Sequence, residues 1–136
     1  MTPEAQRLQA ANEAATREMV DALVRADGPA IAELLADDVI YLFPGRSPLA
    51  GTYRGRDEVM GLFRALAARL GAPPRLHSHD VLASEAHAVD LALHSADRGG
   101  GRFEWRAVRI YHFVGGRVSE IFLTIEDLYG FDAYVE

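Results

Sequence analysis

The chain has 136 residues, the size of one domain, and 49% of them are hydrophobic, which is enough to bury a core. Its formal net charge of −6 disfavours nucleic acid as a partner, because an acidic surface repels a phosphate backbone. The lack of cysteine excludes disulfides and thiol nucleophiles. No basic amphipathic stretch, long apolar run or signal-peptide pattern is present, so we expect no membrane partner and a cytoplasmic location.

The first half of the chain carries mainly helical periodicity. The predicted elements are helices at residues 3–26, 29–36 and 57–70 and a strand at residues 38–43. Asp27-Gly28 ends the first helix and Gly71 ends the third. Pro44-Gly45 breaks the strand, and we expect a polar loop from there to Gly55.

The second half reads as an antiparallel meander. Strands are predicted at residues 75–83, 87–97, 102–114 and 117–126. Glycine-rich turns separate the last three strands. The acidic and aromatic tail, residues 127–136, is expected to be a solvated, partly docked terminus. Helices followed by a run of strands indicate one α+β domain over residues 1–136.

Several short segments, in this order and spacing, resemble the SnoaL-like and ketosteroid-isomerase-like families of the NTF2-like superfamily. They are Leu34 to Val39, Pro44, Gly51 to Val59, His79 to Ala83, and Tyr111 to Glu120. The resemblance covers almost the whole chain. It implies an NTF2-like cone, in which three helices from the N-terminal half pack on a strongly bent, mainly antiparallel sheet around a pocket for a small apolar molecule.

The acids and bases of those families are missing from the matching positions. The resemblance places Phe43 where the isomerases carry a base, Met19 where they carry a tyrosine, and Arg109 where they carry a second acid. The aspartate of SnoaL-type cyclases falls near Leu123. These replacements argue against steroid isomerisation by the family's usual groups.

Strand parity suggests other catalytic candidates. Turns at Ser84-Glu85 and Gly99-Gly100 would place His79 opposite Asp90 and Asp90 opposite Arg109. We therefore predict His79 as base, Asp90 as its orienting carboxylate, and Arg109 as the group that binds an enolate or carboxylate oxygen. The predicted substrate-binding residues are Tyr41, Phe43, Met19, Phe63, His94, Trp105, Tyr111 and Leu123.

His79, Asp90 and Arg109 would form a polar row across three strands, and the sequence leaves open which face of the sheet carries it. Simple alternation would bury Val89, Leu91 and Leu93 and turn Asp90 to solvent. The resemblance favours the opposite assignment, with the apolar set facing a second protomer, so we expect a homodimer. A further alternative is a metal site formed by His77 and His79 with His94 or Asp90, although the predicted site includes no metal.

The function hypotheses follow from the same residues. The first is a cofactor-independent enzyme that cyclises, isomerises, hydrates or dehydrates an apolar, polyketide-like small molecule by acid–base chemistry. The second is a non-catalytic ligand-binding or dimerisation protein that keeps the pocket but has lost the family's acids and bases. A cavity with converging polar groups would favour the enzyme.

Overall fold

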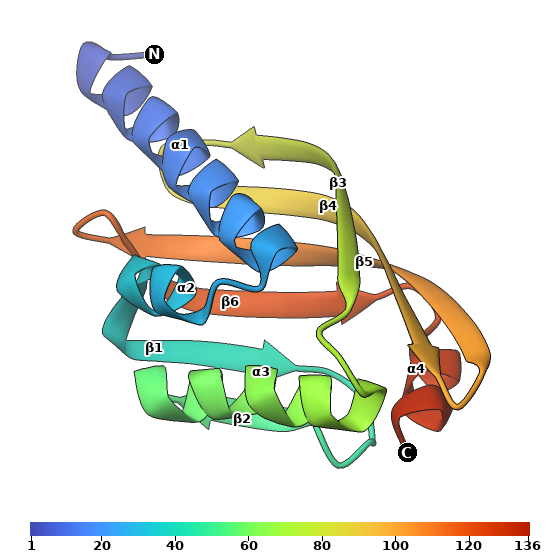
Figure 1. The fold of residues 1–136 in the computed structure, drawn as a ribbon. Helices are drawn as coiled ribbons and strands as arrows, with labels where there is room; N and C mark the ends of the chain where they lie inside the picture. Colours follow the sequence, from blue (N-terminus) through green and yellow to red (C-terminus); the bar gives the residue numbers. More distant parts are fainter.

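One six-stranded sheet and four helices make up the fold. The computed structural model describes the backbone of residues 1–136 and every side chain except that of His79. In chain order the elements are α1 (Pro3–Arg25), α2 (Gly28–Leu34), β1 (Leu35–Phe43), β2 (Gly51–Arg54), α3 (Arg56–Leu70), β3 (Arg75–Ala83), β4 (His87–Arg98), β5 (Gly101–Val114), β6 (Arg117–Ile125) and α4 (Leu128–Val135) (Figure 1).

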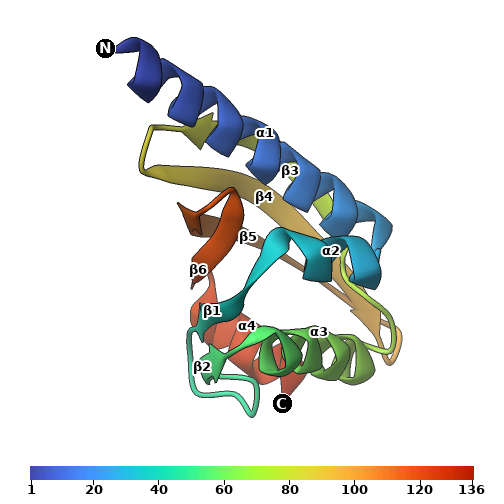
Figure 2. The same cartoon turned by 90° about the vertical axis from the view of Figure 1, so that its left-hand side faces the viewer.

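The sheet is strongly bent and covered on one face. Its strand order is β2-β1-β6-β5-β4-β3, with β1 parallel to β6 and every other neighbouring pair antiparallel. Helices α1, α2 and α3 lie along the concave side, as the turned view shows (Figure 2). The short helix α4 packs near the end of α3 and against β5 (Figure 1). This is the α+β cone that the sequence predicts.

Local signals explain how α1 begins, ends and docks. The Thr2 hydroxyl accepts a hydrogen bond from the Ala5 amide (3.1 Å) and Pro3 occupies the first turn. The helix closes on Ala26 in the left-handed conformation. The buried Asn12 amide donates to the carbonyl oxygens of Ser84 (3.1 Å) and Glu85 (3.0 Å), which joins α1 to the β3–β4 connection.

Two segments differ from the sequence prediction. The segment expected to be a loop contains β2, which pairs with the end of β1 from Ile40↔Arg54 to Phe43↔Gly51. The tail expected to be solvated forms α4 instead. Phe131 and Val135 lie one helical turn apart, and both are buried in the main core. The tail is therefore part of the core, because its aromatic and aliphatic residues share one helix face.

The predicted strand register is partly right. Asp90 lies opposite Arg109, as predicted. The predicted opposition of His79 to Asp90 is wrong, because Asp90 pairs with Val81. The β3–β4 connection spans residues 84–86 rather than a two-residue turn, and the register shifts again between Ser78 and Asp80.

The structure also decides which face of β4 points inward. Asp90 and His94 are buried on the concave face, whereas Val89, Leu91 and Leu93 are half-buried on the outer face. His77 pairs with Leu93 and is exposed, so it does not share a face with Asp90, as the alternative metal site would require. The polar row thus faces the helices, and the apolar row faces outward.

Candidate functional site

A cavity of about 230 Å³ lies between the concave face of the sheet and the helices. Strands β1, β3, β4, β5 and β6 form one wall, and residues of all four helices and of the α3–β3 connection form the others. The lining residues are Leu23, Ala26, Gly28, Ile31, Tyr41, Phe43, Met60, Leu62, Phe63, Arg64, Leu66, Ala67, Pro73, Pro74, Leu76, His94, Trp105, Arg109, Leu123, Ile125 and Phe131. Most are apolar, and the volume is just below the roughly 300–1,000 Å³ typical of small-molecule sites. The cavity therefore suits a compact apolar ligand.

Aromatic rings build much of this wall. Trp105 meets Phe131 edge-on with ring centroids 5.1 Å apart, and Phe131 lies 5.9 Å from Phe43. Tyr41 meets Phe63 edge-on at 5.9 Å. Such rings supply large, stiff apolar surfaces to the wall.

Among the described residues, Arg109 is the charged group on the sheet wall of the cavity. It projects from the middle of β5 and is only 8% exposed. Its Nη1 donates to Asp90 Oδ2 (3.2 Å), and its Nη2 lies 2.6 Å from His94 Nε2. Burial, the largest single influence, would lower the pKa of Arg109, but the Asp90 carboxylate and the Tyr111 and Tyr41 hydroxyl groups together raise that pKa above its usual value. The guanidinium therefore stays charged inside an apolar cavity.

Asp90 lies behind this arginine and does not line the cavity. Its side chain is fully buried, and Oδ2 also accepts a hydrogen bond from the Tyr111 hydroxyl (2.7 Å). A buried carboxylate is tolerated only when it is paired and hydrogen-bonded, and both conditions hold here. Asp90 thus holds the guanidinium from the side away from the cavity, and Arg109 remains at the cavity wall.

His94 is held as a neutral hydrogen-bond acceptor. A guanidinium can only donate, so His94 Nε2 must accept from Arg109, which places the ring hydrogen on Nδ1. Burial, reinforced by the Arg109 charge, lowers the pKa of His94 to about 2. The ring also stacks on Trp105, with centroids 5.2 Å apart and planes 10° apart. With its lone pair engaged, His94 orients Arg109 and is not a general base.

Two tyrosines complete the polar cluster. Burial raises the pKa of Tyr41, although the Arg109 charge acts against the rise. Burial and the Asp90 carboxylate raise the pKa of Tyr111 well above its ordinary value. Both phenols are therefore neutral at physiological pH. Tyr41 lines the cavity, whereas Tyr111 does not and serves Asp90.

The structure brings together most of the residues predicted for ligand binding. The predicted residues that line the cavity are Tyr41, Phe43, Phe63, His94, Trp105, Leu123 and Arg109. Met19 is buried in the core but is not part of the cavity wall. Tyr111 and Asp90 lie behind the wall. The side chain of His79 lies outside the described part of the structure, so its predicted role as base stays a prediction.

Sequence reasoning missed Phe131, Leu76 and Ile31, which also line the cavity. A signal for Phe131 exists: Leu128, Phe131 and Val135 recur at helical spacing in the tail. Leu76 could not be assigned to the inner face because the β3 register was unknown. Cavity walls built from distant segments leave no local pattern.

The cluster can offer hydrogen-bond donors and positive charge to a ligand oxygen. Among the described residues, no three His, Asp or Glu side chains converge closely enough to hold a metal ion. His77 and His94, two members of the alternative metal site, lie on opposite faces of the sheet.

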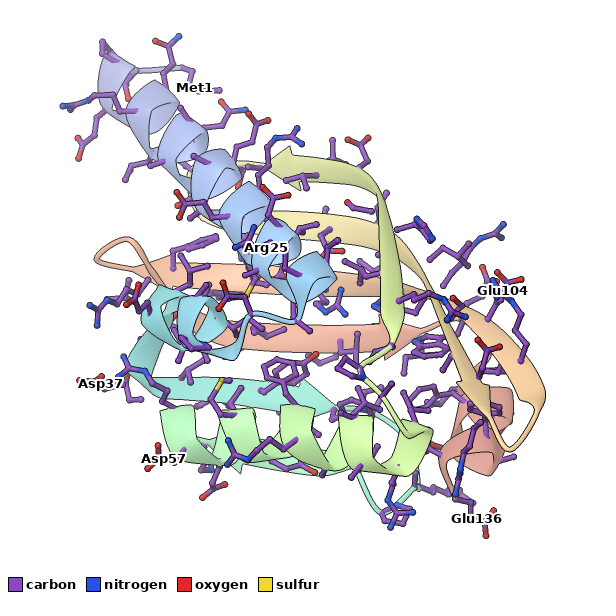
Figure 3. All side chains as sticks on the ribbon, viewed as in Figure 1. Met1, Arg25, Asp37, Asp57, Glu104 and Glu136 are labelled. Carbon is purple, nitrogen blue, oxygen red and sulfur yellow. The ribbon has the colours of Figure 1, made fainter. Side chains whose placement is uncertain are left out.

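Acidic side chains such as Asp37, Asp57 and Glu104 lie at the periphery of the molecule (Figure 3). Within the described helices, none is long and apolar enough to cross a bilayer.

Comparison with known proteins accounts for this architecture. A family model described as a SnoaL-like domain matches residues 16–121. The chain belongs to the SnoaL-like family. SnoaL-like proteins share the NTF2-like fold, and the family includes isomerases and cyclases. The family match does not identify an activity or a substrate for this chain. An uncharacterised protein of Mycobacterium tuberculosis is 27% identical over 101 residues, covering 74% of this chain and 77% of the relative.

Solved structures are similar over nearly the whole SnoaL-like chain. Bal32a, from a soil-derived mobile gene cassette, has a TM-score of 0.89 at 25% identity and covers 95% of this chain and 99% of its own. TerC, co-crystallised with polyporic acid, has a TM-score of 0.82 at 16% identity, covering 92% and 98%. A ketosteroid-isomerase candidate from Kribbella flavida has a TM-score of 0.67 at 21% identity, covering 88% and 80%. The last two likenesses show the shared fold alone.

Proposed function

We propose that this SnoaL-like protein is a cofactor-independent enzyme that acts on an apolar, carbonyl-bearing small molecule, such as a polyketide, by acid–base cyclisation, isomerisation or (de)hydration. The observation that carries the proposal is the Arg109 guanidinium, buried in the wall of an apolar cavity and held by Asp90 and His94. A fixed positive charge in a site of low dielectric stabilises negative charge that develops on a substrate oxygen.

The step that this cluster would assist is enolisation. A base removes a proton from the carbon beside the carbonyl, and the C–H electron pair forms a carbon–carbon double bond. The carbonyl π pair moves to oxygen, which becomes negative beside Arg109. The base proposed from the sequence is His79, whereas Asp90 is occupied by Arg109 and Tyr111 and orients the guanidinium instead. Tyr41, neutral and in the same wall, would donate a hydrogen bond to that oxygen.

A second candidate function is ligand binding without turnover. It is favoured by the lining itself, because none of the described lining residues is a carboxylate and the lone pair of His94 is engaged. The crystallisation of TerC with polyporic acid supports a small organic ligand for this fold under either proposal.

Proton exchange separates the two candidates. The probe is 2-acetylnaphthalene, a flat apolar methyl ketone, whose methyl protons exchange with D₂O only through the enol or enolate. We expect the protein to speed this exchange, followed by ¹H NMR, above the buffer rate. Arg109→Lys should slow the catalysed exchange by about 10²–10³-fold, because lysine lacks the planar fork that Asp90 and His94 hold.

Arg106→Lys is the matched control, since Arg106 lies on the same strand but is exposed on the other face. It should leave the exchange rate unchanged. Binding of the ketone without faster exchange would favour the ligand-binding alternative. If the protein neither binds the ketone nor speeds its exchange, the proposed function is contradicted.

A further inference from the structure

The buried polar cluster at the cavity wall is electrically balanced before any ligand arrives. Arg109 contributes one positive charge, and the fully buried Asp90 carboxylate, 3.2 Å away, contributes one negative charge. His94 is neutral because its Nε2 accepts from Arg109. The phenols Tyr41 from β1 and Tyr111 from β5 are neutral as well. The cluster therefore has no net charge to offer a permanent anion.

This balance changes which ligands the cavity accepts. A carboxylate placed against Arg109 would bring a second negative charge close to Asp90 and leave one of the two uncompensated in an apolar interior, which is costly. A neutral carbonyl or hydroxyl oxygen meets no such penalty. The guanidinium can serve it, because Arg109 lines the cavity and carries five N–H donors, more than its bonds to Asp90 and His94 use. Among the described residues, the other cation in the lining is Arg64 on α3, which is exposed, so solvent screens it.

We propose that Asp90 is a specificity-determining residue: by neutralising Arg109, it restricts the cavity to ligands that are uncharged in their ground state and excludes carboxylates of the same shape. This inference rests on the proposed function, because it specifies the ligand of the same cavity. It assigns Asp90 a role different from orienting a catalytic base. Removing the Asp90 charge should convert the cavity into a receptor for carboxylates.

The test compares two ligands that share one ring system. These are 2-acetylnaphthalene, which is neutral, and 2-naphthoate, in which a carboxylate replaces the methyl ketone. Calorimetric titration of the wild-type protein from pH 6 to pH 8 should give a constant affinity for the ketone. The affinity for the acid should fall about tenfold per pH unit, because only its protonated form binds and its pKa is near 4.

Asp90→Asn is the informative variant. The asparagine oxygen at the Oδ1 position can still accept from Arg109 Nη1, and its amide at the Oδ2 position can donate to the Tyr111 oxygen, so each partner can keep one hydrogen bond. The naphthoate-to-ketone affinity ratio at pH 7 should rise at least tenfold, and the pH dependence of naphthoate binding should disappear. Asp38→Asn, a change of the same charge at an exposed position of β1, should alter neither.

The outcomes are separable. Wild-type protein that binds naphthoate as well as the ketone, independently of pH, would overturn the role of Asp90 and leave the ligand-binding function standing. An unchanged affinity ratio in folded Asp90→Asn protein would also overturn it. If that variant fails to fold, the wild-type pH series still decides. Absence of binding by both naphthalenes would contradict the proposed function, and this inference with it.

Discussion

Asp132 of α4 lies directly against Gly45, 87 residues earlier in the chain, at the end of β1. A Cβ atom built on Gly45 would overlap Asp132 Oδ1, because it would lie closer than real Cβ contacts allow. Asp132 Oδ2 accepts a hydrogen bond from the Arg46 amide (2.9 Å). This contact joins α4 to β1, and Phe131, the neighbour of Asp132, lines the cavity.

Gly45→Ala should therefore destabilise the fold by more than backbone strain alone. Gly45 has φ +101°, where a side chain costs about 1–3 kcal/mol. Gly116→Ala is the matched control, because Gly116 has φ +79° with nothing within 4 Å of the new Cβ. Urea unfolding should give a larger loss for Gly45→Ala, and adding Asp132→Ala should relieve the excess. Equal losses at the two glycines would show that the Asp132 contact is unimportant.

Phe131→Ala should lower the free energy of unfolding by about 3–5 kcal/mol and enlarge the cavity. Phe131 is 1% exposed and packs on Trp105 and Phe43. The control is Tyr129→Ala in the same helix, where the side chain is 83% exposed and the expected change is below about 0.5 kcal/mol. Urea denaturation measures both. Similar small losses would mean that α4 is not part of the cooperative core.

The lowered pKa of His94 should make the folded protein less stable in mild acid. Burial holds its folded pKa at about 2, whereas an unfolded histidine has a pKa of about 6.5. Below pH 6.5 the unfolded chain therefore binds a proton that the folded chain does not. The free energy of unfolding should fall by up to about 1.4 kcal/mol for each pH unit below that point.

His94→Gln should flatten this dependence, since glutamine can accept from Arg109 without titrating. Urea unfolding of both proteins between pH 6.5 and pH 4.5 measures the two slopes. Identical slopes would rule out a neutral His94 in the folded protein. Nitrogen-15 spectra at pH 5 provide a second readout, with the proton expected on Nδ1.

The outer face of the sheet predicts a homodimer. Its apolar row comprises Val89, Leu91, Leu93, Val108, Ile110 and Phe122, and helices α1 to α3 lie on the opposite side (Figure 2). An uncovered apolar patch of this kind is unusual on a monomer. Light scattering should give twice the chain mass of 14.9 kDa.

Phe122→Glu should shift that mass to the monomer value, because Phe122 is 43% exposed and lies beside Ile110 at the β6 side of the row. Val24→Glu, at a similarly exposed apolar site on α1, should leave the mass unchanged. A wild-type protein that scatters as a monomer at micromolar concentration would exclude the dimer.

The sequence predicted those features that depend on local patterns. Helical periodicity and glycine turns located most elements, and the tight Gly99-Gly100 turn fixed the β4–β5 register and hence Asp90 opposite Arg109. The β3 register failed because a three-residue connection and a shift near Ser78 leave no pattern in the sequence. The contact between Arg109 and His94 was missed because it joins residues that are diagonal across two strands.

The parallel pairing of β1 with β6 has a consequence for synthesis of the chain. Tyr41 pairs with Ile121, so β1 can join the rest of the sheet only after β6 has been made. Phe131 and the contact of Asp132 with Gly45 arrive later still. A nascent chain can form α1 and the β3–β4 hairpin early, but the wall around Arg109 closes only once α4 has been made. Binding of ligand therefore reports that synthesis has passed α4 and that α4 has docked.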